Sequence, residues 1–387
     1  MKNDTKVFIY YGPLSWFKSQ LADKSSIRIL DIIDERDEAN RRYTLIFEGQ
    51  KEAPPERATS RPEGIAAESS DYASLREHVI TNFSGLVRSI NPVNLYLHNP
   101  PARVHSQLER SFSTKVIRYT YPLVTRDTLI RFRDDFAKRL VGQSAAKETI
   151  LAALYPLTRE RLKKPLVLMF YGPSGVGKTE TAQLINELLG GTLLRIQFSM
   201  FNGEKFASYT YGGSHYEASF SHDLLDRESG VILIDEFDKA NPVFHSVFYQ
   251  LFDIGVFEDK NYIVELGPSL IICTSNYSTE DEIRKALGDA LYSRFDSLIR
   301  FDPLSKNEIR QVVDKIVDDR VSKLESDEKD ILQPESIKAK MYPVANSVAN
   351  VRKIGKLVDE VISLMLVRAV INDTARDSDR SNIEEAV

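Results

Sequence analysis

The strongest chemical signal in the sequence is the run Gly172-Pro173-Ser174-Gly175-Val176-Gly177-Lys178-Thr179, which fits the pattern G-x-x-x-x-G-K-[ST]. Glycines let backbone N–H groups turn towards an anion, and the amino end of a following helix adds a favourable dipole. In such a loop the lysine meets the β- and γ-phosphates and the hydroxyl meets Mg²⁺. The run therefore predicts a site for ATP and Mg²⁺, with Lys178 and Thr179 in those two roles and Glu180 also in contact with the nucleotide.

The flanking residues supply the elements that such a loop needs. Residues 166–171 (LVLMFY) form an apolar run suited to a buried parallel strand. Residues 181–189 have the apolar spacing of a helix, which Gly190-Gly191 would end. Strand, glycine loop and helix in this order favour a phosphate site over the alternative, a glycine turn without a ligand.

Two further apolar runs end in polar side chains. Residues 231–234 (VILI) precede Asp235 and Glu236. Residues 270–273 (LIIC) precede Thr274, Ser275 and Asn276. Open α/β sheets bind ligands at the carboxyl ends of their strands. We therefore expect Asp235 to orient the Mg²⁺ shell, Glu236 to polarise the attacking water, and Asn276 to hold that water or a γ-phosphate oxygen. The alternative for the two carboxylates is a solvated acidic pair after a core strand.

Composition limits the class of protein. The chain has 387 residues and a net charge of −5, so its surface as a whole is not built for nucleic acid, and a nucleic-acid partner is not expected. Its single cysteine, Cys273, excludes an intrachain disulfide and favours a reducing, cytoplasmic location. The chain has no apolar run near 18 residues, so we expect no membrane span. The six histidines form no HExxH pattern.

Patterns along the chain predict an α/β fold in four parts. Residues 1–125 are expected to be a small α/β domain with a mobile loop over 50–71, which is rich in proline and in small or charged residues. Residues 126–301 are expected to be an α/β nucleotide-binding module with a parallel sheet between helices. Residues 302–370 read as helical, and 371–387 as a polar tail.

Within the first part, short β-branched and aromatic runs predict strands, and longer periodic runs predict helices. The predicted strands cover 7–11, 27–30, 43–47, 93–97 and 115–119, and the predicted helices cover 72–90 and 102–112.

The order of the glycine loop, the Asp-Glu strand and the Thr-Ser-Asn strand resembles an AAA+ ATPase. The resemblance is closest to the second ATPase module of the Clp unfoldase and disaggregase family, and it covers about residues 126–370. Val141-Gly142-Gln143 resembles the segment that this family places beside the adenine, and residues 235–240 (DEFDKA) resemble its D-E-x-x-K-A sequence. The resemblance implies a P-loop module followed by a helical lid.

Two arginines gain roles from this resemblance. Arg294 lies where the family has an arginine finger, which a neighbouring subunit supplies to the γ-phosphate, although Ser293 replaces the usual asparagine before it. Arg352 lies in a segment that resembles sensor 2, where Asn350-Val351 replaces the usual Gly-Ala. An arginine finger implies a ring of identical subunits, which in this family is a hexamer. A surface ion pair is the alternative for each arginine.

A ring that threads polypeptide needs a residue that grips it. The family places an aromatic, typically within Gly-Tyr-Val-Gly, on a loop that faces the central pore. The matching place here is Thr210-Tyr211-Gly212-Gly213, although no glycine precedes Tyr211. The alternative is a tyrosine-rich loop that packs on its own domain.

One absence bears on the partner. Family members that work with a peptidase insert an Ile-Gly-Phe or Ile-Gly-Leu loop, and residues 277–293 contain neither. The resemblance therefore implies an ATP-driven hexamer that unfolds or remodels proteins without a Clp peptidase and selects a client or adaptor through residues 1–125. The alternatives are a nucleotide-dependent switch or scaffold, and a motor directed to nucleic acid.

Overall fold

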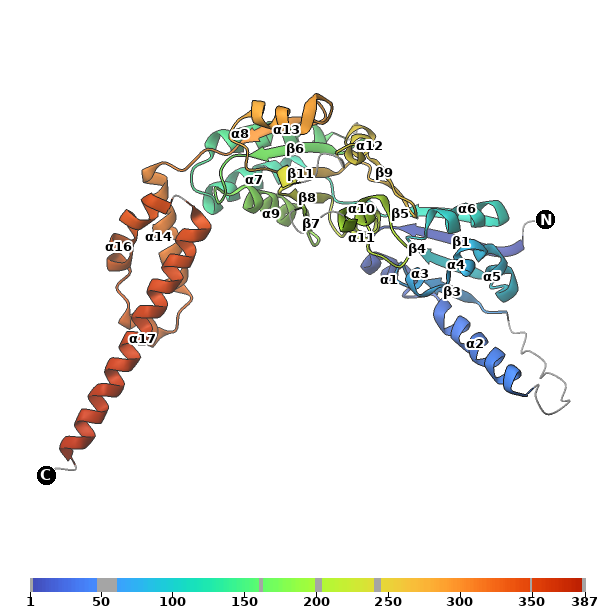
Figure 1. Ribbon diagram of the computed structural model, residues 1–387, viewed down its shortest axis with the longest axis horizontal. Coiled ribbons are helices and arrows are strands. Elements are labelled where there is room, and N and C mark those ends of the chain that lie inside the picture. Colours follow the sequence, from blue (N-terminus) through green and yellow to red (C-terminus); the bar gives the residue numbers. More distant parts are fainter. Residues whose placement is uncertain are drawn as a thin grey trace.

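The computed structural model describes residues 3–46, 61–159, 163–198, 204–239, 245–348 and 350–384. They form three units that follow one another along an arc (Figure 1). We call them the N-terminal unit (residues 3–118), the central unit (126–300) and the helical unit (306–384). Among the described residues, no helix is both long and apolar enough to cross a membrane.

The N-terminal unit is a five-stranded, wholly parallel sheet with the order β2-β3-β4-β1-β5. Alternate residues of β1 face opposite sides, because successive side chains of a strand point in opposite directions. Val7 and Ile9 join one apolar cluster with α5 and α6, whereas Tyr10 joins Phe17 of α1 on the other face. The strands are β1 (Asn3–Tyr11), β2 (Ile27–Arg28), β3 (Gly64–Ala67), β4 (Asn94–His98) and β5 (Phe112–Arg118). The helices are α1 (Leu14–Leu21), α2 (Ile29–Ile46), α3 (Asp71–Ser74), α4 (Glu77–Thr81), α5 (Phe83–Ile90) and α6 (Ala102–Ser111).

Several expectations for this unit were wrong. The predicted strand at 43–47 lies at the end of helix α2 as far as residue 46, and the predicted strand at 27–30 shortens to β2. Leu30, Ile32 and Ile33 all pack against the core. The helical spacing of these apolar residues outweighs the β-propensity of residues 43–46, because β-propensity depends strongly on context.

The predicted mobile loop over 50–71 is wrong for its second half. Residues 64–67 form β3, which lies between β2 and β4 in the sheet, and Asp71 begins α3. Ile65 is 1% exposed. This four-residue strand was too short for a pattern-based prediction. Residues 50–60 of the predicted loop lie outside the described residues. The predicted helix over 72–90 is broken into α3, α4 and α5, with extended backbone at Leu75 and Arg76.

The central unit contains a second parallel sheet, with the order β12-β6-β11-β8-β7 and helices on both sides (Figure 1). Strands β6, β8 and β11 are buried along their whole length, as their continuous apolar sequences predict. The strands are β6 (Leu166–Tyr171), β7 (Leu194–Gln197), β8 (Val231–Asp235), β11 (Leu270–Thr274) and β12 (Ser297–Arg300), and a separate hairpin has β9 (Val256–Glu258) and β10 (Ile263–Glu265). The helices are α7 (Arg126–Arg139), α8 (Ser144–Leu154), η1 (Tyr155–Thr158), α9 (Lys178–Leu189), α10 (Glu204–Tyr211), α11 (Phe220–Asp226), η3 (Phe237–Lys239), α12 (Val247–Ile254) and α13 (Glu280–Tyr292).

The helical unit has a core of its own. Val313, Ile337 and Val358 from three different helices are fully buried in it. Its helices are α14 (Lys306–Ser322), α15 (Ser326–Ile331), α16 (Pro334–Val348) and α17 (Val351–Glu384). The backbone of α17 remains helical to Glu384, so the tail predicted from residue 371 is a helix over most of its length. In Figure 1 this helix extends away from the other helices of the unit.

The strand register sets the position of the site. Cys273 of β11 pairs with Ile234 of β8, and Thr274 pairs with Phe170 of β6. The carboxyl ends of these three strands therefore meet at one edge of the sheet. Asp235 is the last residue of β8, and the glycine loop and Asn276 follow the ends of β6 and β11.

Candidate functional site

One cavity of about 490 Å³ lies between the carboxyl edge of the central sheet and the helical unit. A volume of this size suits a small-molecule or nucleotide ligand. The sequence-predicted residues that line it are Val141, Ser174, Gly175, Val176, Gly177, Lys178, Thr179, Glu180, Asp235, Glu236, Asn276 and Arg352. Gly142, Gln143, Gly172, Pro173, Arg294 and Tyr211 are not among the lining residues.

The glycine loop has the backbone that its sequence predicts. Gly175 and Gly177 adopt φ values of +79° and +106°, which L side chains rarely adopt. Lys178 Nζ donates hydrogen bonds of 2.7 Å to both Gly172 O and Pro173 O, and one of 3.3 Å to Asn276 Oδ1. Burial lowers the pKa of the Lys178 amine to about 8, partly offset by the carboxylate of Asp235.

The lysine environment tests whether a nucleotide fits. In the described part of the chain, Lys178 forms hydrogen bonds only to neutral oxygens and no ion pair with a carboxylate. A buried cation without an ion-pair partner is costly, so an anion in the loop would be stabilised there. Phosphate in the cavity supplies that anion, and the backbone conformation at Gly175 and Gly177 lets N–H groups face it. The residues present therefore fit a nucleotide phosphate.

A single hydroxyl connects the two predicted acidic residues. Thr274 Oγ1 donates to Asp235 Oδ1 at 2.5 Å and accepts from the backbone N–H of Glu236 at 3.0 Å. Glu236 has φ +56°, an uncommon conformation for a residue other than glycine. Thr274 is 2% exposed, so its position is set by the core. The last residue of β11 thereby fixes the carboxylate of Asp235 and the backbone of Glu236 relative to the P-loop.

Sequence reasoning missed the contribution of β7. Arg195 donates to Asp235 Oδ2 from Nε at 3.1 Å and from Nη2 at 2.5 Å, and Gln197 Nε2 donates to Glu236 Oε2 at 3.2 Å. Arg195 and Gln197 both line the cavity. The signal was the alternation of Leu194 and Ile196 with these two polar residues, which places both on one face of the strand.

The helical unit contacts both ends of the cavity. Asn350 Nδ2 donates to Ser174 O at 3.0 Å, and Val351 N donates to Gly175 O at 3.2 Å. At the other end, Lys315 Nζ of α14 donates to Arg139 O, the last residue of α7, at 2.8 Å. The angle of the helical unit is therefore linked to the P-loop by direct hydrogen bonds.

The segment predicted to lie beside the adenine is divided by the structure. Val141 lines the cavity. The side chain of Gln143 instead bonds the backbone of Asp302, which lies between β12 and the helical unit. It donates to Asp302 O at 2.7 Å and accepts from Asp302 N at 3.0 Å. Gly142 has φ +73° and lies against Glu308 of α14. Gly142 and Gln143 therefore position the helical unit, and only Val141 faces the cavity.

The two predicted arginines lie in different places. Arg352 lines the cavity, and its charge further lowers the pKa of Lys178. Arg294 lies outside the cavity, where its Nε donates to Asp253 Oδ2 at 2.9 Å and its guanidinium lies 4.4 Å from the centre of the Tyr249 ring. A quarter of the Arg294 side chain is exposed.

Tyr211 is the last residue of α10 and is 46% exposed. Its carbonyl accepts a 3.0 Å hydrogen bond from Lys260 N, in the turn of the β9–β10 hairpin. Tyr209 is buried, with its hydroxyl 2.6 Å from Asp223, whereas Tyr216 is 63% exposed. Ala240, the last residue of the 235–240 motif, lies outside the described residues.

A metal fits the donor set only together with a nucleotide. No group of three or more histidine, cysteine or carboxylate side chains gathers into a metal site among the residues the structure describes. Mg²⁺ commonly uses one or two protein ligands and takes the remainder from phosphates and water. Thr179 and Asp235, both at the cavity, match that pattern.

Comparison with known proteins agrees with this geometry. Residues 163–335 match the family described as AAA domain (Cdc48 subfamily). The chaperone protein ClpB of Clostridium tetani is 25% identical over 282 residues, which is 64% of this chain and 32% of that protein. The ClpA homolog protein of Fuscovulum blasticum is 30% identical over 236 residues, which is 52% of this chain and 30% of that protein. This chain thus spans about a third of the length of these relatives.

A solved structure extends the likeness in fold. A closed state of Hsp104 with ATPγS and FITC casein superposes with a TM-score of 0.55 at 15% identity, over 96% of this chain and 90% of that one. The P-loop, the two acidic residues at the end of β8 and the polar end of β11 line one nucleotide-sized cavity within the matched region. Residues 163–335 thus match an AAA domain, and the chain is similar to Clp-type proteins over the region that contains this cavity.

Proposed function

We propose that this protein hydrolyses Mg²⁺-bound ATP and uses the energy to unfold or remodel other proteins. The lining of a single cavity by Lys178, Thr179, Asp235 and Glu236 carries the proposal of ATP hydrolysis, and the similarity to the chaperone protein ClpB supports the proposal of remodelling. Lys178 binds the phosphates, while Thr179 and Asp235 hold the metal, which supplies charge neutralisation at the phosphates. Glu236 accepts a proton from the attacking water, and Asn276, hydrogen-bonded to Lys178, orients that water.

We further propose that the active assembly is a homo-oligomeric ring, with six subunits as in the resembled family. The cavity holds Arg352 of its own chain, whereas Arg294 lies elsewhere and is held by Asp253. An arginine in that position can reach a phosphate only in a neighbouring subunit's cavity, where it would stabilise charge in the transition state. In this proposal residues 126–301 and 302–370 form the ATPase core and lid, and residues 1–125 select a client or adaptor.

We also propose that the ring acts without a Clp peptidase. Residues 277–293 contain no Ile-Gly-Phe or Ile-Gly-Leu tripeptide. Of these residues, 280–292 form helix α13. Remodelling or disassembly therefore fits better than delivery to degradation.

The Glu236→Gln variant tests the proposal. Glutamine keeps the shape and the hydrogen bond to Gln197 but cannot accept the proton, so the variant should bind ATP and stop hydrolysing it. Turnover is measured by phosphate release, with Glu228→Gln, an exposed carboxylate away from the cavity, as control. Affinity capture of the ATP-bound variant would then identify the client. Phosphate release at the wild-type rate would overturn the role of Glu236.

A nucleotide-dependent switch or scaffold is the second candidate. It is favoured by the bond from Lys260 N to Tyr211 O, which holds Tyr211 against the hairpin. Tyr211→Ala separates the two functions. A remodeller should keep its ATPase activity and lose remodelling of a captured client, whereas a switch should keep both nucleotide-dependent client binding and release.

A further inference from the structure

The carboxyl edge of the N-terminal sheet has the features of a ligand crevice. In open parallel sheets such crevices form where the loops from neighbouring strands leave towards opposite faces. Here β1 leads into α1 on one face and β4 leads into α6 on the other. The crevice is filled by its own side chains: Asn99 bonds both Gly12 N at 3.1 Å and Gly12 O at 3.0 Å, and His98 Nε2 donates to Gly12 O at 2.7 Å.

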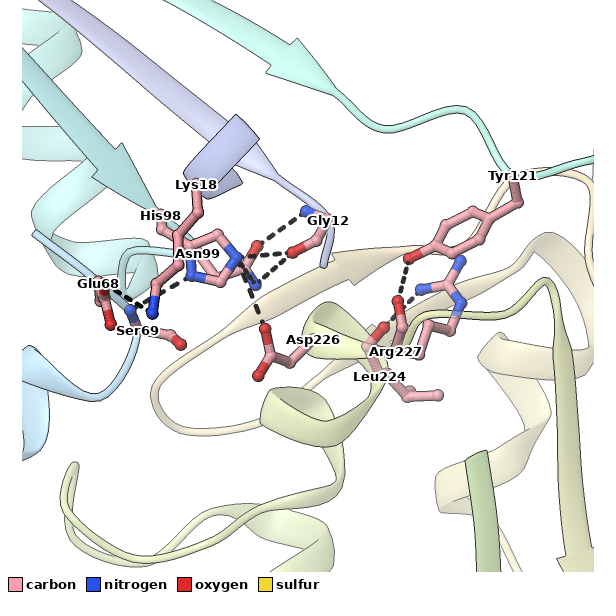
Figure 2. A network of polar contacts seen from close by, with 10 residues as sticks. All are labelled: Gly12, Lys18, Glu68, Ser69, His98, Asn99, Tyr121, Leu224, Asp226 and Arg227. Carbon is pink, nitrogen blue, oxygen red and sulfur yellow. Dashed lines mark hydrogen bonds and ion pairs between the residues drawn. The ribbon is translucent and has the colours of Figure 1, made fainter. Parts of the chain in front are cut away.

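The central unit covers this edge at the end of α11, as Figure 2 shows. The Asp226 carboxylate lies 3.5 Å from His98 Nε2. Beside it, the Tyr121 hydroxyl donates to Arg227 O at 2.9 Å, and the Arg227 guanidinium lies 4.1 Å from the centre of the Tyr121 ring. The crevice of the N-terminal sheet thus has a residue of the ATPase module as its neighbour.

A second set of contacts joins the N-terminal unit to the segment that follows Tyr211 in the central unit. His215 Nε2 donates to Leu75 O at 2.7 Å, and its Nδ1 lies 3.0 Å from the Glu77 carboxylate. The start of α6 joins the hairpin turn, since Ala102 N donates to Asn261 O at 2.8 Å. That turn also bonds the segment itself, because Asn261 Nδ2 donates to Gly213 O at 3.2 Å. We call these contacts, with that between Asp226 and His98, the docking seam.

The docking seam includes polar contacts that are incompletely satisfied, and beside them one apolar cluster, which includes Tyr72 and Tyr262, continues from the N-terminal unit into the central unit. Asp226 Oδ1 and His215 Nδ1 are buried atoms without a hydrogen-bond partner among the described residues. A cavity of about 420 Å³ lies at the seam, with Leu75, Arg76 and Glu77 on one side and Ser214, His215 and Tyr216 on the other. Opening the seam would let water reach these two atoms and supply the hydrogen bonds that they lack in the docked state.

We propose that the N-terminal unit restrains the segment 211–216 through the docking seam, and that this segment moves only when the seam opens. The docked unit thereby limits ATP-driven movement until a partner displaces it. This inference rests on the proposed function for the task of Tyr211, whereas the contacts themselves are independent of it. Restraint follows because the segment bonds the hairpin turn and the N-terminal unit at once.

Two substitutions on opposite sides of the seam test the proposal in the full chain. His215→Ala removes both of its contacts, and Glu77→Arg places a cation beside His215 at a side chain that is 72% exposed, so the fold is not at risk. Hydrogen–deuterium exchange is followed in peptides covering 204–219. We expect exchange about fivefold faster in both variants, the factor that corresponds to losing one ordinary hydrogen bond. Basal ATP turnover should rise together with it.

Glu217→Ala is the matched control, because Glu217 is an exposed residue that directly follows the segment, lies within the same peptides and makes no seam contact with its side chain. Unchanged exchange in both seam variants, equal acceleration in Glu217→Ala, or faster exchange without faster turnover would each overturn the restraint. Failure of the proposed function is a separate observation, since it appears as hydrolysis retained by Glu236→Gln and leaves the exchange result intact.

Discussion

Arg195 of β7 donates two hydrogen bonds to one oxygen of Asp235, the carboxylate that we propose holds the metal. The other oxygen of Asp235 accepts the Thr274 hydroxyl, so both oxygens already have partners. The guanidinium therefore competes with a metal shell for the same carboxylate. It also neutralises a side chain that is only 7% exposed.

The first prediction concerns this competition. Arg195→Gln should lower the Mg²⁺ concentration needed for half-maximal ATP binding by about tenfold, since hydrogen bonds to charged groups contribute roughly 1.5–3 kcal/mol. Fluorescent ATP titrated with Mg²⁺ in the Glu236→Gln background measures it without turnover. Gln197→Ala, which contacts Glu236 instead, should leave the Mg²⁺ midpoint unchanged. A higher midpoint in Arg195→Gln would show that the arginine assists the metal.

Thr274 gives the second prediction, because its hydroxyl fixes Asp235 and Glu236 together. Thr274→Val keeps the volume but removes the hydroxyl, so kcat should fall about tenfold while KM changes little; the lost bond to a charged group costs roughly 1.5–3 kcal/mol. Thr274→Ser retains the hydroxyl and should keep most activity. Steady-state kinetics of the three proteins measures this split, and a valine variant with wild-type kcat would contradict it.

The third prediction concerns Asn350, which has two separate hydrogen bonds. Its Nδ2 reaches Ser174 O in the P-loop, and its Oδ1 accepts from Lys353 N at the start of α17. Asn350→Ser can cap the helix but is too short to reach Ser174. Both Asn350→Ser and Asn350→Ala should weaken nucleotide binding about fivefold, the cost of one ordinary hydrogen bond.

Thermal unfolding distinguishes the two roles of Asn350. Loss of a helix cap costs about 1 kcal/mol. Only Asn350→Ala should therefore lower the Tm. If the serine variant binds nucleotide as tightly as the wild type, the contact with Ser174 has no part in binding.

The fourth prediction concerns pH. Burial lowers the pKa of Lys178 from 10.5 to about 8 in the protein without nucleotide. A bound phosphate stabilises the protonated amine, so the complex holds this proton to higher pH than the free protein does. The affinity for ADP should then be constant below about pH 8 and fall by up to about tenfold per pH unit above it.

Calorimetric titration with ADP in EDTA from pH 6.5 to 9.5 avoids the metal. The lowered pKa of Lys178 also affects folding stability. Between pH 8 and 10.5 the unfolded chain binds more protons at Lys178 than the folded protein does, so the contribution of Lys178 to the free energy of unfolding rises with pH across that window. An ADP affinity that stays flat through pH 9.5 would contradict the assignment of Lys178.

The sequence by itself determined the three inner strands β6, β8 and β11 of the central sheet and the polar segments at their carboxyl ends. Each of β6, β8 and β11 is buried on both faces, so each has an unbroken apolar run in its sequence. The polar residues of the site come directly at or after the end of that run. Glycine spacing likewise predicted the P-loop backbone, because positive φ at Gly175 and Gly177 excludes most other residues. These signals are local, and a local signal survives without knowledge of the partners in space.

Only the tertiary structure decided which distant groups meet. Arg195 with Asp235 and Asn350 with Ser174 are pairs separated by many residues, and they are brought together by strand order and by the position of the helical unit. The strand β3 was hidden because its four residues gain stability only from the neighbouring β2 and β4. The docking seam between His215 and Leu75 left no pattern in either segment, since an interface between two units depends on how both surfaces are placed.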